Sequence, residues 1–221
     1  MASRLAARGH MLTAVLLTAV TMTVAAPPPD AGLQAYQKRD YPAARAEFER
    51  RAGDGDRVAQ FNLAMMLVRG EAGPTDVAGG LVWLQRSADA GLAQAQYNLG
   101  LMHESGVGVP RSLIAATLWW SKAAEQGHTD AQVQLATQYF LGRGAAKDWK
   151  LAAKWYEAAA KGGDPGAQYI IGSFYEHGDG VAQDLNKALT WYAEAARQGD
   201  LGAAAQAKDV ARRLSSAPRA P

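Results

Sequence analysis

The chain repeats itself every 36 residues, and this period constrains its fold more than any other feature. An Ala-Gln pair stands at Ala59-Gln60 and Ala95-Gln96, and again at residues 131–132 and 167–168. Ala203 holds the same place a fifth time. Repeats of this length are supersecondary units that must stack, because one unit alone leaves its apolar face in water. The period therefore predicts an extended array of small units.

Each repeat carries the signals of two helices. One recurring position holds residues that cap helix N-termini by accepting hydrogen bonds from first-turn amides: Asp40, Asp76, Ser112, Asp148 and Asp184. In the second full repeat we expect one helix over about 93–105, ended by Gly106 in a left-handed conformation, and another over about 112–126, ended by Gly127. The predicted fold class is all-α, an α-solenoid of stacked helix–turn–helix repeats.

Apolar residues mark the faces that stack. A tryptophan recurs in the second helix at Trp83, Trp119, Trp155 and Trp191, and we expect it in the core. Small residues at positions 64, 100, 136 and 172 are predicted to let helix backbones approach closely. Gly79-Gly80 falls in a first helical turn and is expected to weaken that helix, by about 1 kcal/mol per glycine.

These motifs together resemble the Sel1-like repeat family, α-solenoid relatives of the tetratricopeptide repeat. The last full repeat carries them best, with Ala167-Gln168, Ile171-Gly172, Tyr175, Gly178, Gly180-Val181, Asp184, Lys187-Ala188, Trp191-Tyr192, Ala195-Ala196 and Gly199. The resemblance spans about residues 31–213. His103 and Leu67 replace its tyrosine, and Ala64 and Ala136 replace its glycine. It implies a scaffold that binds partners on a curved surface.

The predicted organisation follows from these marks and from the ends of the chain. Arg4 and Arg8 precede an apolar stretch from Met11 to about Val24, the pattern of a secretory signal peptide. We expect a signal over 1–25, cleaved or retained as an anchor, a proline-rich spacer over 26–30 and a solenoid over 31–214. Within the solenoid we expect a degenerate unit over 31–55, full units over 56–91, 92–127, 128–163 and 164–199, and a capping helix over 200–214. Residues 215–221 are expected to be a disordered tail, and the mature protein to be periplasmic or secreted.

Composition excludes several functions. The 221 residues include no cysteine, which removes disulfides, cysteine-ligated metals and thiol nucleophiles. Lys and Arg number 23 against 21 Asp and Glu, and losing Arg4 and Arg8 with the signal leaves 23 − 2 = 21. This balance does not favour nucleic acid as a partner. No cofactor is expected, and no membrane span in the mature chain.

Candidate catalytic residues are few. His103 takes a packing position of the repeat, and His128 lies at a helix entrance, where a capping or solvated role is expected. Glu176-His177 lacks the second histidine of a metal motif. No serine has a lysine three residues later, as serine β-lactam enzymes require. Trp149 lies outside the tryptophan register, and we expect it to be exposed near a turn.

The sequence thus predicts a non-enzymatic scaffold that binds a protein or peptide along one face of its first helices. The candidate residues, called the A-helix row below, vary between repeats: Asn62, Met65, Arg69, Asn98, Leu101, Ser105, Gln134, Thr137, Leu141, Ile170, Ser173 and His177. Two alternatives stay open, a cell-wall hydrolase or β-lactam-binding enzyme, and a glycan-binding scaffold of an envelope assembly machine. The identity of the partner and the oligomeric state are not predicted.

Overall fold

The computed structural model describes residues 30–216, and this part of the chain forms eleven α-helices and no strands. The helices are α2 (Ala31–Gln37), α3 (Tyr41–Gly53), α4 (Arg57–Arg69), α5 (Val77–Asp89), α6 (Ala93–Ser105), α7 (Leu113–Glu125), α8 (Thr129–Leu141), α9 (Trp149–Lys161), α10 (Pro165–His177), α11 (Leu185–Arg197) and α12 (Leu201–Ser216). The predicted all-α solenoid is confirmed. The expected signal peptide, most of the spacer and residues 217–221 lie outside the described residues.

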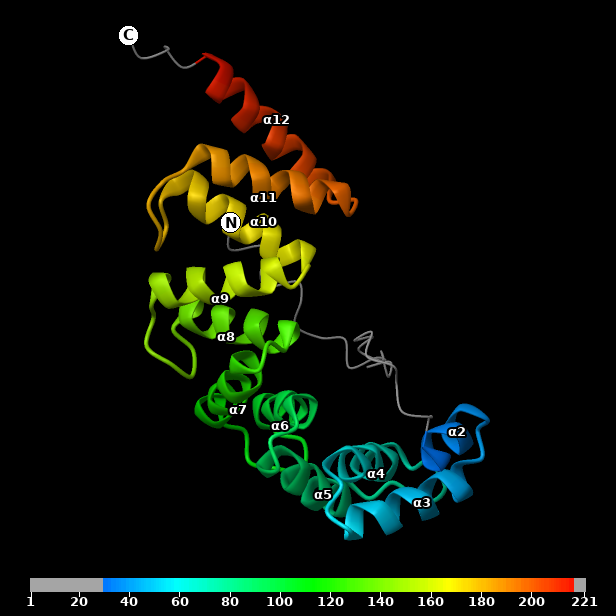
Figure 1. Ribbon diagram of the computed structural model, residues 1–221. Helices are drawn as coiled ribbons and strands as arrows, with labels where there is room; N and C mark the ends of the chain where they lie inside the picture. The colour runs from blue at the N-terminus through cyan, green and yellow to red at the C-terminus, as the bar shows by residue number, and fades with distance from the viewer. Residues whose placement is uncertain (1–29, 217–221) are drawn as a thin grey trace.

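The helices follow one another along an arc (Figure 1). We call α4, α6, α8 and α10 the A helices, and α3, α5, α7, α9 and α11 the B helices. Figure 1 shows α4 and α6 on the inner side of the arc and α3, α5 and α7 on its outer side. Helix α2 stands at one end of the arc and α12 at the other.

Capping residues set the helix boundaries. Ser112 Oγ accepts a hydrogen bond from the Ala115 amide, and α7 begins at the next residue. Gly106 ends α6 with a φ of 78°, in the left-handed region that favours glycine. Both helices match the predicted ranges to within a residue. The other four predicted N-caps, Asp40, Asp76, Asp148 and Asp184, also accept amide hydrogen bonds.

The recurring glutamine joins each A helix to the B helix before it. Its buried Nε2 donates to a backbone carbonyl eight residues earlier, in the last turn of that B helix, at 3.1–3.2 Å. The four pairs are Gln60 to Ala52, Gln96 to Ala88, Gln132 to Ala124 and Gln168 to Ala160. Each of these carbonyls also accepts the amide of the glycine three residues later, so the glutamine adds a second hydrogen bond at the end of the B helix. The Ala-Gln signature therefore has a structural role at the junction of units.

The deepest aromatic position lies one residue after the recurring tryptophan. Leu84, Trp120, Tyr156 and Tyr192 are at most 1% exposed. Of the recurring tryptophans only Trp119, at 9%, counts as buried, and Trp83, Trp155 and Trp191 are half-buried. The expectation that all four belong to the core is thus wrong for three of them. These three pack against the core from its edge.

The small residues of the A helices make room for these deep side chains. A Cβ at Gly100 would lie 2.4 Å from Trp120 Nε1, and one at Gly172 would lie 2.9 Å from the Tyr192 ring. The space left by the missing Cβ is therefore filled by a side chain of the B helix. The sequence had instead suggested that it would let two helix backbones approach closely. Helix α5 runs through Gly79 and Gly80, and a Cβ at Gly80 would lie 2.9 Å from the Ala64 carbonyl oxygen. Gly80 thus lets α5 lie close against α4.

A polar contact fastens α12 to the last repeat. Glu176 is 6% exposed, and its Oε2 accepts a 2.8 Å hydrogen bond from the Tyr192 hydroxyl. Its Oε1 pairs with the Arg213 guanidinium from α12. Helix α12 continues through Ser216, two residues beyond the expected end of the capping helix. Between residues 30 and 216, no helix combines the length and apolarity needed to cross a bilayer.

Candidate partner-binding surface

The A-helix row is exposed mainly at the C-terminal ends of its helices. Its last member on each helix is exposed: Arg69, Ser105, Leu141 and His177. Six members are half-buried, namely Asn62, Met65, Leu101, Gln134, Thr137 and Ile170. Asn98 and Ser173 are buried, at 8% and 3% exposure. The structure therefore concentrates the accessible side chains of the row along one edge of the A helices.

Some members of the row have hydrogen-bond partners within the protein. Thr137 Oγ1 lies 2.9 Å from the hydroxyl of the buried Tyr156. Asn98 Nδ2 donates to the Gln94 carbonyl at 2.8 Å, within α6. His177 Nδ1 lies 2.8 Å from the Ser173 carbonyl oxygen. These groups have internal partners, so a ligand would meet them already hydrogen-bonded.

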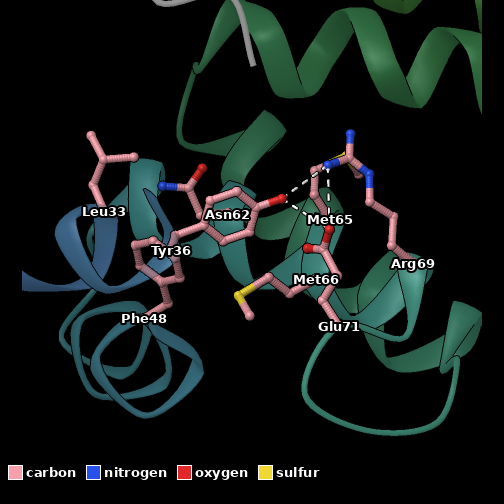
Figure 2. Close-up of a pocket in the computed structure, with 8 residues that line it drawn as sticks. All are labelled: Leu33, Tyr36, Phe48, Asn62, Met65, Met66, Arg69 and Glu71. Atoms are coloured by element: carbon pink, nitrogen blue, oxygen red, sulfur yellow. Dashed lines mark hydrogen bonds and ion pairs between the residues drawn. The ribbon is translucent and has the colours of Figure 1, made fainter. Parts of the chain in front are cut away.

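A small pocket opens where α2 meets α4 (Figure 2). Three members of the row line it, Asn62, Met65 and Arg69, and the remaining wall comes from Leu33, Tyr36, Phe48, Met66 and Glu71. The Tyr36 hydroxyl donates to Glu71 Oε1 at 2.9 Å, and Arg69 Nη1 lies 3.9 Å from the same oxygen. Burial, together with the Glu71 carboxylate, raises the pKa of Tyr36. The pocket thus contains a carboxylate and a guanidinium above an apolar floor.

The junction of α6 and α8 is also polar. His128 caps α8, because its Nδ1 accepts the Ala131 amide at 3.3 Å, while its Nε2 lies 3.1 Å from Gln94 Oε1. Its ring stacks on Tyr97 with the ring centroids 4.6 Å apart. Burial lowers the pKa of His128. Burial, with the nearby charges of Asp130 and Glu104, raises the pKa of Tyr97 to about 12. The predicted capping role of His128 agrees with this geometry.

An open groove of about 700 Å³ lies between α11 and the α9–α10 junction. The half-buried Trp191 lines it, together with the polar residues Lys161, Gln168, Thr190, Glu194, Arg197 and Gln198. Arg197 and Glu194 form an ion pair with each other. The groove therefore offers one aromatic face among hydrogen-bonding groups.

The residues considered for catalysis have structural surroundings. Glu176 is engaged by Tyr192 and Arg213. His103 is half-buried, and its Nδ1 has no hydrogen-bond partner among the described residues. Within residues 30–216, no three His, Asp or Glu side chains gather as metal ligands would. Trp149, 36% exposed, begins α9 and packs on Phe140 and Phe174, so it is partly covered by these rings.

The predicted row does not include Tyr36 and Glu71, the polar pair that lines the α2–α4 pocket beside it. The sequence places Tyr36 only within the degenerate unit expected over 31–55 and does not single out Glu71. Glu71 follows the glycine that ends α4, and the equivalent positions hold Val107, Arg143 and Asp179. A position that varies in this way carries no periodic signal, so only the fold brings Glu71 and Tyr36 together.

Comparison with known proteins agrees with this architecture. The family model described as Sel1 repeat matches residues 57–92, 93–128, 129–164 and 165–200. A Sel1 repeat protein from Oxalobacter formigenes is 31% identical, with a TM-score of 0.77 over 86% of this chain and 79% of that one. A protective antigen of uropathogenic Escherichia coli with an SLR fold is 33% identical, with a TM-score of 0.67. That match covers 72% of this chain but only 34% of the antigen.

A search of curated proteins found no match. The repeat matches follow the observed helix pairs, since each covers one A helix and the B helix after it. They take in well over half of the chain. The protein therefore belongs to the Sel1 repeat family.

Proposed function

We propose that the protein is an exported scaffold that binds a protein or peptide partner along the A-helix row. Sel1 repeat solenoids generally serve as scaffolds for protein–protein interaction. The observation that carries the proposal is that the A helices have two kinds of position, one that packs in the core and one that is exposed and variable. Packing positions such as Leu63 and Leu99 keep their character in each repeat, while the exposed ends of the row carry Arg69, Ser105, Leu141 and His177. Variable side chains on a constant frame are what partner recognition requires.

Affinity capture from the cells that make the protein tests this proposal. The full chain and a variant with Ser105→Glu and Leu141→Glu are compared by mass spectrometry of captured proteins. A third variant, Val82→Glu with Leu118→Glu, alters exposed side chains on the B helices. We expect the row variant to lose a partner that the other two retain. Identical captured proteins for all three would refute a role for the row.

Export is proposed on the amino-terminal pattern alone. A basic start followed by an apolar stretch from Met11 to about Val24 is typical of secreted proteins. Mass spectrometry of the protein recovered from the cell envelope should give an amino terminus near residue 26. A full-length chain recovered only from the cytoplasm would contradict export.

Glycan binding is a second candidate, favoured by the groove beside Trp191. An aromatic face surrounded by hydrogen-bonding side chains suits the apolar face and the hydroxyls of a sugar ring. Trp191 also differs from Trp83, Trp119 and Trp155, over which a cationic side chain lies. Saturable quenching of tryptophan fluorescence by cell-wall oligosaccharides, lost in Trp191→Leu, would support this role. An unchanged spectrum would exclude these sugars.

A further inference from the structure

The carboxylate of Glu71 is only half satisfied in the α2–α4 pocket. Its Oε1 accepts the Tyr36 hydroxyl, but its Oε2 is buried and has no hydrogen-bond partner among residues 30–216. The Glu71 side chain as a whole is 19% exposed. Buried carboxylate oxygens are almost always paired, because an unpaired one loses its hydrogen bonds to water and gains none in return. The pocket therefore has an acceptor to offer.

The size and walls of the pocket restrict what Oε2 can accept. The cavity volume of about 10 Å³ holds one water-sized group. A primary ammonium group has this size, whereas the planar guanidinium group of arginine is larger. The walls of Leu33, Phe48 and Met66 offer apolar contact to methylene carbons, beside the polar groups that line the rest of the pocket. Size, charge and apolar walls together favour an ammonium group on an aliphatic stem.

We propose that this pocket binds a primary ammonium group of the partner, either a lysine side chain or an α-amine, with Glu71 Oε2 as its acceptor. The site rests on the proposed function, since Asn62, Met65 and Arg69 of the A-helix row line it. Figure 2 shows Arg69 on the side of the carboxylate that faces the Tyr36 hydroxyl. The incoming cation reaches the other oxygen without displacing this guanidinium.

Methyl NMR of the full chain tests the site directly. Met65 and Met66 line the pocket, so their ¹³C-labelled methyl groups report on its occupancy. The probes are Nα-acetyl-lysine N-methylamide for a lysine side chain and leucine N-methylamide for an α-amine, and each has an acetylated counterpart without the positive charge. We expect saturable shifts of these methyl signals with at least one cationic probe and none with its acetylated counterpart. Equal shifts with both forms, or no saturable shift, would overturn the proposal.

Two variants separate the site from general effects of charge. Glu71→Gln keeps the shape of the side chain and is expected to weaken probe binding by about tenfold or more, because a charge-assisted hydrogen bond is lost. Asp179→Asn removes a carboxylate at the equivalent position of the last repeat and should leave probe binding unchanged. Undiminished binding to Glu71→Gln would refute the role of Oε2. Circular dichroism establishes that both variants fold.

The outcome also distinguishes this site from the proposed function. Suppose that the variant with Ser105→Glu and Leu141→Glu loses its partner, while Glu71→Gln still binds the probe and the partner as tightly as the wild type does. The ammonium site is then refuted and the scaffold function stands. If probe binding depends on Glu71 but no partner depends on the row, the site stands and the proposed function fails.

Discussion

A second glycine recurs in three of the four loops that join an A helix to the next B helix, and two separate physical constraints require it there. Gly144 and Gly180 have φ values of 73° and 70°, which L side chains rarely adopt. A Cβ at Gly144 would lie 2.4 Å from the Leu113 carbonyl oxygen, and one at Gly180 would lie 2.1 Å from that of Trp149. Each glycine therefore lets its loop lie against the start of the preceding B helix.

Replacing Gly180 with alanine should lower the free energy of unfolding by more than backbone strain alone would, because the added Cβ also collides with α9. Gly199 has a similarly positive φ of 94°, but a Cβ there meets nothing within 4 Å. We expect Gly199→Ala to lower the free energy of unfolding by about 1–2 kcal/mol, and Gly180→Ala by about 1–3 kcal/mol more. Chemical denaturation of both variants measures the difference. Equal losses would show that the loop does not touch α9.

Ala72 marks the loop where this glycine is missing. It occupies the position of Gly108 and has a φ of 66°. Ala72→Gly should therefore raise the free energy of unfolding by about 1 kcal/mol, because a strained non-glycine residue is relieved. Ala78→Gly, in the regular helix α5, should lower it by about as much. Changes of the same sign in both variants would contradict the left-handed conformation of Ala72.

His128 should make stability depend on pH. Its Nδ1 must be unprotonated to accept the Ala131 amide, and burial lowers its folded pKa below the unfolded value. Because the unfolded state then binds more protons, stability decreases as the pH falls below about 6.5. His128→Asn keeps a capping side chain that does not titrate. Urea denaturation at pH 7.5 and 5 should show a larger loss for the wild type, and equal losses would count against this cap.

At the scale of the helices, the sequence predicts boundaries well and burial less well. Caps and glycines act within one turn, so α6 and α7 could be located from residues such as Ser112 and Gly106. Depth of burial depends on how two units pack. Trp119 and Trp120 are adjacent in one helix, and only the fold reveals that Gly100 makes space for the second. Side-chain contacts between units, such as that of Tyr36 with Glu71, likewise could not be predicted from the sequence.

Helix α12 should depend on Arg213 for its attachment. Arg213→Met leaves the buried Glu176 carboxylate with only the Tyr192 hydroxyl as a partner. It should lower the free energy of unfolding by about 1–3 kcal/mol, which is less than for a fully buried ion pair because Arg213 is partly exposed. Arg212→Met removes an exposed ion pair with Asp209 and should change stability by less than about 0.5 kcal/mol. Thermal and urea denaturation compare the two. A similar effect of both variants would mean that the Glu176 contact does not hold α12.

At the scale of the whole molecule, periodicity determines the architecture and says nothing of the partner. Four repeats of one length predict a stacked solenoid, because each unit covers the apolar face of its neighbour. The arc seen in Figure 1 comes from small rotations between units that no single residue encodes. The surface left on the A helices differs from repeat to repeat, and only about a third of the predicted row is exposed. Periodic positions were therefore predictable, and surface chemistry was not.

Photo-crosslinking in living cells tests the central claim, that a partner binds the A-helix row, most directly. A photoreactive amino acid is placed at Ser105 or Leu141 of the row, and at Val82 or Leu118 of the B helices, all of which are exposed. We expect adducts with one protein from positions 105 and 141 and none from positions 82 and 118. Adducts confined to positions 82 and 118 would place the partner on the B helices and refute binding at the row.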